Sequence, residues 1–301
     1  MERHSLGDND RRRCSVSRLD HAMRLRFAAS LLCVCATPAA LSQTPSSLQE
    51  WQYSRGWVLL RLFEVDVPKK VTLVGVAAER GPLYVGAPPS SYRTRGGPVL
   101  ELRYRDIAFA SVGEGAGVNI LRGKNYLAGV AVGYDLGRYV SEDSVHLRGL
   151  ADVSRAPVLK LFGSYAISRD FPLVLRSDLR KFVGGAAGVE GDVGAYVPLP
   201  GCSRSLWMFA GPGITWSDRR HLTRSFGISP VDSLRSGYPQ FQPHAGVESA
   251  GFGFSASWIL STRWMLNADA AVNRLSGSAR DTPLTAQRVQ HVVTTSVVYV
   301  W

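Results

Sequence analysis

Regular alternation of apolar and polar residues near the C-terminus constrains the fold of this chain more than any other sequence feature. Trp264 and Leu266 face one way and Asn267 the other, and segment 290–301 alternates similarly and ends on Trp301. Successive side chains of a β-strand point to opposite faces, so such segments predict strands with one apolar face. Strands of about ten residues with aromatic, apolar faces suit the wall of a transmembrane β-barrel. A water-soluble barrel would show the same alternation with its apolar face inside.

The N-terminal region favours the membrane alternative. Residues 23–42 contain a short basic stretch, an apolar run from Phe27 to Ala36 and a small-x-small site at 40–42, which together predict a cleaved secretory signal peptide. The apolar run is too short for the ~20 residues that a spanning helix needs. We therefore expect residues 1–42 to be an extension plus signal peptide, with Met1 or Met23 as the initiator. Residues 43–69 would form a lead-in and 70–301 the barrel.

Composition excludes several other classes of protein. The formal charge of the whole chain is +11, and removal of residues 1–42 leaves 28 basic and 20 acidic residues, a charge of +8. These charges are scattered along alternating strands, so an anionic membrane surface containing lipopolysaccharide is a better partner than nucleic acid. The six histidines and the single cysteine beyond residue 42, Cys202, show no metal-ligand spacing. We expect no metal, no cofactor and no disulfide.

The strand count predicts an all-β, closed, antiparallel barrel with up-and-down connections. We expect strands near 70–79, 97–105, 107–116, 125–136, 157–168, 171–181, 187–199, 204–217, 243–260, 262–275 and 289–301. Bacterial outer-membrane barrels have even strand numbers, so one strand is missed in this list. Short and long connections alternate correctly after residue 137, which places the error earlier, either at 56–66 or as a split within 107–136. Twelve strands is the expectation, and ten the alternative.

Charged residues on the non-lipid faces define a candidate lumen. They are Glu101, Arg103, Arg105, Lys160, Arg176, Asp178, Arg180, Glu190, Asp192, Arg263 and Asp269. These charges either pair with one another and fill a narrow barrel, or they line a selective pore or ligand pocket.

Two further candidate sites lie near the long connections. His244 and Glu248 share one face of an expected strand, but alternation sends Ser249 to the opposite face, so a lipid-modifying enzyme would need a serine from another strand. We therefore do not expect an enzyme. The basic segment 218–224, with Arg235, is either a binding site for lipopolysaccharide phosphates or a solvated loop.

The last residues carry an expected assembly signal. Tyr299 and Trp301 lie on the same predicted lipid-facing side of the final strand. Resemblance to other bacterial outer-membrane proteins implies that the barrel-assembly machinery recognises such an aromatic end. The last strand must also pair with the first, because unpaired backbone groups in lipid cost several kcal/mol each.

Three segments resemble the MltA-interacting protein (MipA/OmpV) family of outer-membrane proteins. Segment 274–284 is similar to the family's RLLGDAADSPI stretch, 226–230 to its FGVS loop, and 84–93 to its early Y-x-GS-x-x-YR segment. The matching loop residues are Phe226, Gly227, Arg274, Leu275, Gly277, Asp281 and Pro283. The chain departs from the pattern at Ser276, Arg280 and Ala87-Pro88-Pro89.

The resemblance implies an outer-membrane barrel of a Gram-negative bacterium and supplies no catalytic residues. It also implies a scaffold between peptidoglycan-remodelling enzymes, namely a lytic transglycosylase and a penicillin-binding protein. A small diffusion channel for polar solutes is the main alternative, and a lipid-modifying barrel enzyme the second.

Overall fold

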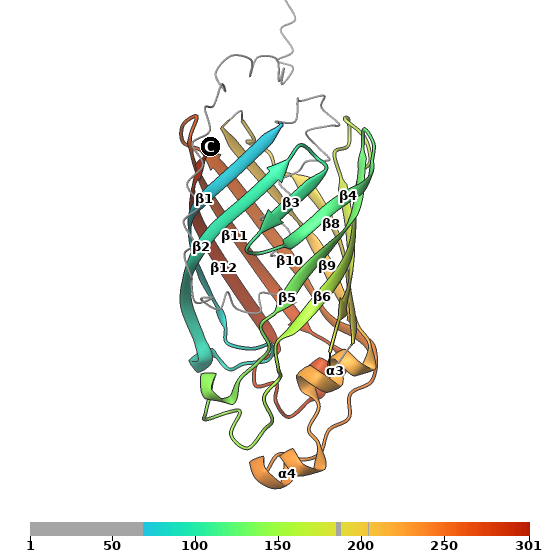
Figure 1. Ribbon diagram of the computed structural model, residues 1–301. Helices are drawn as coiled ribbons and strands as arrows, with labels where there is room; N and C mark the ends of the chain where they lie inside the picture. The colour runs from blue at the N-terminus through green and yellow to red at the C-terminus, as the bar shows by residue number, and fades with distance from the viewer. Residues whose placement is uncertain (1–68, 185–187, 204) are drawn as a thin grey trace, which may run out of the picture.

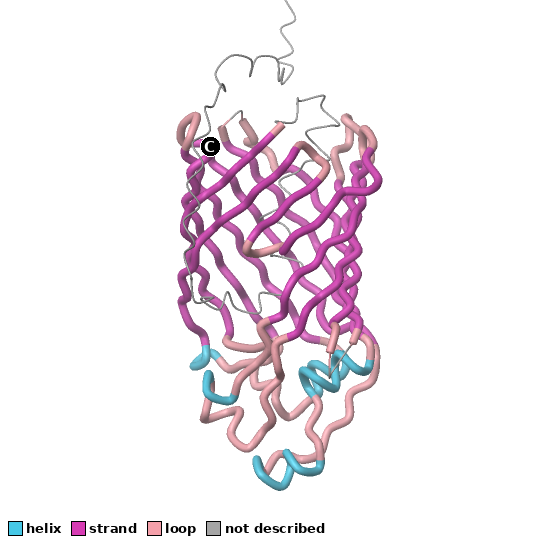
Figure 2. The backbone as a smooth tube through the Cα atoms, in the orientation of Figure 1, coloured by secondary structure: helices cyan, strands magenta, loops and turns pink. Residues whose placement is uncertain are grey.

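The computed structural model describes residues 69–184, 188–203 and 205–301, which form a closed antiparallel barrel of twelve strands (Figures 1 and 2). Each strand pairs with its neighbours in the sequence, and β1 pairs with β12 to close the ring. The strands are β1 (Lys70–Pro82), β2 (Tyr92–Tyr104), β3 (Ala108–Ser111), β4 (Gly115–Arg122), β5 (Tyr126–Asp135), β6 (Ala156–Ala166), β7 (Val174–Phe182), β8 (Val189–Pro198), β9 (Leu206–Ser217), β10 (Gly246–Ile259), β11 (Trp264–Leu275) and β12 (Val289–Val300). The expected fold class, with twelve strands, is confirmed.

The missing strand comes from a split within 107–136. β3 is only four residues long and turns back into β4, with Gly115 at φ 82°. A side chain at residue 115 would be strained at this φ and would meet the carbonyl of Val132, so glycine is required there. β3 pairs with β2 only over residues 101–104. The alternative position at 56–66 lies outside the described residues, as do the expected signal peptide and nearly all of the lead-in.

Alternation along the strands sorts the side chains into an apolar outer face and a polar inner face. In β11, Met265, Asn267 and Asp269 are buried, whereas Trp264 and Val272 are exposed. The same holds around the ring, where large apolar side chains such as Leu161 and Val76 are exposed to the outside. An exposed apolar band around a closed barrel is the surface that a lipid bilayer covers.

The two rims of the barrel differ. At the rim that holds both the start of β1 and the end of β12, the strands are joined by short turns, whereas long segments with helices project from the opposite rim (Figure 1). Exposed aromatic side chains gather at the strand ends on the short-turn rim: Tyr104, Tyr126, Tyr165, Phe171, Trp258, Trp264 and Trp301. Such a girdle marks a membrane interface, and short turns mark the periplasmic side. The helical rim is therefore the extracellular one.

Helices and loops pack over the extracellular rim. They comprise η1 (Pro89–Ser91), η2 (Val140–Glu142), α3 (Arg219–Phe226), α4 (Pro230–Ser236) and α5 (Gly277–Asp281). Leu222 and Phe226 of α3 form a small core with Leu275 and Ala279. A second core joins Leu83 and Tyr84 to Leu147. Among the described residues, no helix is long and apolar enough to cross a membrane.

Candidate functional site

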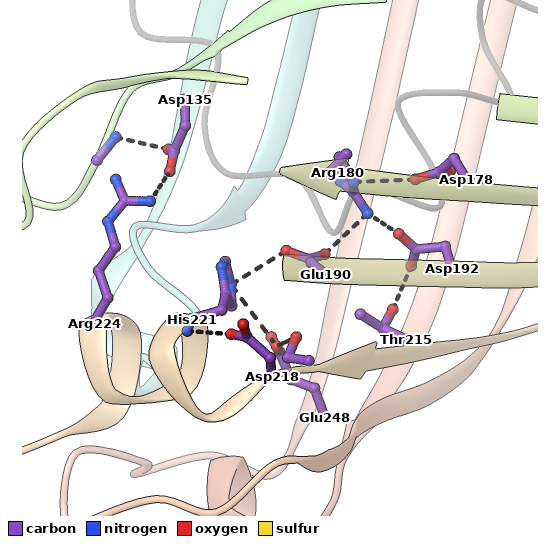
Figure 3. A network of polar contacts seen from close by, with 12 residues as sticks. Asp135, Asp178, Arg180, Glu190, Asp192, Thr215, Asp218, His221, Arg224 and Glu248 are labelled. Atoms are coloured by element: carbon purple, nitrogen blue, oxygen red, sulfur yellow. Dashed lines mark hydrogen bonds and ion pairs between the residues drawn. The ribbon is translucent and has the colours of Figure 1, made fainter. Parts of the chain in front are cut away.

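A cluster of charged side chains occupies the lumen near the extracellular rim (Figure 3). The β7–β8 register sets Asp178 opposite Asp192 and Arg180 opposite Glu190, all facing inward. Arg180 Nε lies 3.1 Å from Asp178 Oδ1 and Nη2 lies 2.9 Å from Glu190 Oε1. Asp192 also pairs with Arg180 and accepts a hydrogen bond of 2.6 Å from Thr215 Oγ1. One buried guanidinium thus balances part of the charge of three carboxylates.

A β-bulge in β10 adds a fourth carboxylate. The β9–β10 register shifts between Val247 and Ser249, so both Glu248 and Ser249 are buried. Ser217, which is fully buried, donates a hydrogen bond of 2.5 Å from Oγ to Glu248 Oε2. Because a bulge inserts one extra residue, it places two consecutive side chains on the same side of the wall.

His221 closes this cluster from the extracellular side. Asp218 caps α3 by accepting a hydrogen bond of 2.7 Å from the His221 backbone N–H, which directs the histidine toward the lumen. His221 Nε2 lies 3.2 Å from Glu190 Oε2 and 4.0 Å from Glu248 Oε2. Burial lowers the pKa of His221, and this effect outweighs the opposing influence of Glu190. Nε2 is the ring nitrogen that faces Glu190, whereas the buried Nδ1 has no hydrogen-bond partner among the described residues.

A second ion pair ties α3 to the barrel wall. Arg224 Nη1 lies 2.8 Å from Asp135 Oδ2 at the end of β5, and Nη2 donates a hydrogen bond of 2.7 Å to the carbonyl of Ser154. The guanidinium also stacks over Phe182, 5.4 Å from the ring centroid. Together with His221, these contacts hold α3 against the barrel wall beside the charge cluster (Figure 3).

The expected lumen charges fall into three groups. Asp178, Arg180, Glu190 and Asp192 form the cluster described above. Glu101 and Arg103 pair on β2, and Arg103 Nη2 lies 3.7 Å from Glu114, while Lys160, Arg176 and Asp269 belong to β6, β7 and β11. Two assignments are wrong: Arg105 and Arg263 lie in the turns before β3 and β11, where both are exposed. β2 ends one residue earlier than expected, at Tyr104, and β11 begins two residues later than expected, at Trp264.

The residues of the family segments lie in the extracellular layer. Phe226 and Leu275 belong to the core under α5, and Gly227 ends α3. Gly277, at φ 50°, begins α5, and Arg274 is an exposed residue of β11. Asp281 forms an exposed ion pair with Arg280, 2.7 Å apart, and Pro283 follows the helix. Tyr299 and Trp301 lie together at the periplasmic rim.

The structure brings a serine, a histidine and an acid together, but their hydrogen bonds are not those of a hydrolase triad. A nucleophilic serine needs a base beside its hydroxyl and a third group to orient that base. Here Ser217 donates to Glu248 rather than to His221, and Ser217 is inaccessible. His244, considered from the sequence, precedes β10, and its backbone N–H donates a hydrogen bond of 2.9 Å to Ser278 Oγ. The described residues contain no cluster suited to a metal ion.

Sequence reasoning missed His221, Ser217 and the role of α3. The segment 218–241 reads as a long polar loop, although Asp218 followed by a short amphipathic stretch is a helix-start signal that could have revealed α3. No local signal identifies the bulge at Glu248, because it depends on the register against β9.

The fold and its surface define an integral outer-membrane β-barrel protein with a polar, charge-paired lumen. A family model described as "MltA-interacting protein MipA" matches residues 74–301, so the chain belongs to this family. Among curated proteins, none is significantly similar to the chain.

Several solved structures are similar in fold. The translocator domain of the autotransporter NalP from Neisseria meningitidis is 14% identical, with a TM-score of 0.38, covering 83% of this chain and 95% of that one. OmpT of Vibrio cholerae is 9% identical, with a TM-score of 0.37, covering 79% and 99%. The outer-membrane channel DcaP of Acinetobacter baumannii is 10% identical, with a TM-score of 0.36, covering 77% and 96%.

Proposed function

We propose that this protein is a non-enzymatic scaffold of the outer membrane that holds peptidoglycan-remodelling enzymes at the periplasmic face. The family is described by its interaction with MltA, a lytic transglycosylase. By this proposal the chain binds a transglycosylase of that kind and, beside it, a penicillin-binding protein.

The observation that carries the proposal is the pairing of charges inside the barrel. Arg180 is shared among Asp178, Glu190 and Asp192, and α3 lies over this cluster at the extracellular mouth. Further down, Asn267 bridges Ser257 and Ser296 with hydrogen bonds of 2.8 and 3.1 Å. Polar groups engaged with one another in this way favour a rigid wall over a solvated conduction path. A diffusion channel for polar solutes is the competing function.

The periplasmic rim offers a surface for such partners. Its turns carry the exposed basic residues Arg105, Lys124, Arg169 and Arg263. Asp106, in the same turn as Arg105, lies 3.3 Å from Arg122. Asp170 follows Arg169 in its turn, so the described turns carry these four basic residues and two acidic ones. A rim with an excess of positive charge steers a negatively charged protein surface toward it, which raises the association rate and selects orientation.

The proposal is tested by binding and conductance measured on the same preparation. The full chain in detergent is titrated with a purified lytic transglycosylase and, separately, with an unrelated periplasmic protein of similar charge. We expect binding of the transglycosylase alone, weakened in Arg169→Glu/Arg263→Glu and unchanged in Arg219→Glu on the extracellular rim. Equal binding of both proteins would contradict the scaffold function. Large steady conductance across planar bilayers, without binding of the transglycosylase, would support the channel function instead.

A further inference from the structure

A cavity on the extracellular side lies outside the charge cluster described above. Its volume is about 740 Å³, and its walls come from the loop after β5, the end of β7, α3 and the segment on either side of α4. This volume is within the usual range for small-molecule sites, ~300–1,000 Å³. Apolar side chains that include Phe182, Ile228 and Phe241 form part of its wall.

Four arginines line the cavity, and they differ in how their charge is balanced. Arg224 is neutralised by Asp135 at 2.8 Å. Arg155 stacks on Tyr139, 5.7 Å from the ring centroid, and Arg219 makes only a hydrogen bond of 3.4 Å to the side-chain carbonyl of Gln242. Both residues are exposed. Three guanidinium groups, those of Arg138, Arg155 and Arg219, therefore face this cavity without an ion-pair partner among the described residues.

Arg138 is the most informative of the four. It is only 8% exposed, and its Nη1 donates a hydrogen bond of 2.8 Å to the carbonyl of Ser225. No carboxylate of the described residues lies within ion-pair distance of it. Burial lowers the pKa of Arg138, against the influence of Tyr84, Asp232 and Asp152. Arginine nevertheless stays charged in proteins, so a cation is buried at the wall of the cavity with Asp152 and Asp232 near it but not in ion-pair contact.

The two acidic residues of the cavity are already engaged. Asp152 accepts a hydrogen bond of 2.7 Å from the backbone N–H of Val140, and Asp232 accepts one of 2.6 Å from Ser229 Oγ as part of a capping box. These contacts give both carboxylates structural roles at the ends of the loops. Both keep their negative charge, so four guanidinium groups stand against Asp152, Asp232 and the Arg224 partner Asp135. The cavity therefore carries a small positive excess, presented by planar groups that form paired hydrogen bonds with phosphate oxygens.

We propose that this cavity is a binding site for a phosphate monoester carried on a small organic body, either a soluble sugar phosphate or the phosphorylated sugar of an outer-leaflet lipid. The buried guanidinium of Arg138 and the exposed ones of Arg155 and Arg219 bind the phosphate. The apolar wall at Ile228 and Phe241 contacts the rest of the ligand. The site belongs to the extracellular layer and does not require the periplasmic scaffold role.

The test measures binding to the full chain in detergent micelles by calorimetry at low and moderate salt. The soluble probe is glucose 6-phosphate, with glucose as its uncharged counterpart. The lipid probe is lipopolysaccharide, with enzymatically dephosphorylated lipopolysaccharide as its counterpart. We expect at least one phosphorylated probe to bind, and to bind more tightly than its counterpart. Whichever probe binds identifies the source of the ligand.

Matched variants distinguish binding in this cavity from general electrostatic attraction to the extracellular surface. Arg219→Gln and Arg155→Gln remove exposed cavity charges and should each weaken binding about tenfold, as expected for one charge-assisted contact. Arg220→Gln removes another exposed charge, next in sequence to Arg219, that does not line the cavity. It should leave affinity unchanged. The proposal is overturned if neither phosphorylated probe binds more tightly than its counterpart, or if Arg220→Gln weakens binding as much as Arg219→Gln.

Discussion

The indole ring of Trp301 lies edge-on against the ring of Tyr299, with centroids 5.9 Å apart. Tyr299 in turn lies edge-on to Trp264, at 5.2 Å, so the last residue extends an aromatic row across two neighbouring strands at the periplasmic rim. The backbone N–H of Trp301 also donates a hydrogen bond of 2.9 Å to the carbonyl of Thr72. The C-terminal residue therefore takes part in the seam that closes the barrel.

Deletion of Trp301 should lower the amount of folded barrel in the outer membrane. The deletion removes both the terminal aromatic ring and a hydrogen bond at the β1–β12 seam, where an open edge in lipid is costly. The measurement is the heat-modifiable, protease-resistant fraction in purified outer membranes. Trp216→Ala, which removes an exposed aromatic near the opposite rim, is the control and should assemble normally. An unchanged folded yield after deletion would show that Trp301 is only one more girdle residue.

Leu161→Arg should destabilise the barrel by roughly 2–4 kcal/mol, because it places a cation against the middle of the bilayer. Leu161 is central in β6 and 56% exposed on the outer face. The matched change Leu234→Arg, on the solvent-exposed α4, should have almost no effect. Unfolding in urea from lipid vesicles measures both. Similar stability losses at the two positions would contradict the assignment of the membrane-facing surface.

The extracellular layer should lose stability in mild acid through His221. Burial holds the folded-state pKa of this histidine below its ordinary value of 6.5, so the unfolded chain binds the extra proton more readily. The stability that depends on an uncharged His221 is therefore fully present above pH 6.5, and it is lost as the pH drops below that value. The melting temperature of the unmodified protein should therefore fall relative to that of His221→Gln between about pH 7.5 and 5, a comparison that isolates His221 from other buried groups. His244→Gln, in an exposed loop position, should leave the profile unchanged. A profile that His221→Gln leaves unaltered would assign the acid response to other groups.

Ser217→Ala should cost about 1–3 kcal/mol, because it leaves the buried Glu248 carboxylate without its hydroxyl donor. Ser249→Ala, one residue beyond Glu248 in the same bulge, removes a buried hydroxyl that does not bond to that carboxylate and should cost less. Both are measured by denaturant unfolding. A serine-reactive fluorophosphonate probe should label neither residue in the folded barrel. Labelling that disappears in Ser217→Ala would instead support the enzyme hypothesis.

The sequence by itself determined the wall of this protein. Strand alternation is a local property, and it correctly predicted the closed barrel. In β11 the buried residues Asn267 and Asp269 alternate with Leu266, which is more exposed. The alternation of short and long connections also located the missing strand to one of two segments before residue 137. Its position within 107–136 was left open because β3 is only four residues long, too short for its periodicity to stand out.

Only the tertiary structure decided what the inward-facing groups meet. Glu248 faces the lumen beside Ser217 because of a register shift against β9, and His221 reaches the same carboxylate from a helix in a different connection. Arg138 is buried without an ion-pair partner among the described residues because the loop after β5 folds back against α3. Register and loop packing depend on contacts between residues far apart in the sequence, so no local pattern of residues can specify them.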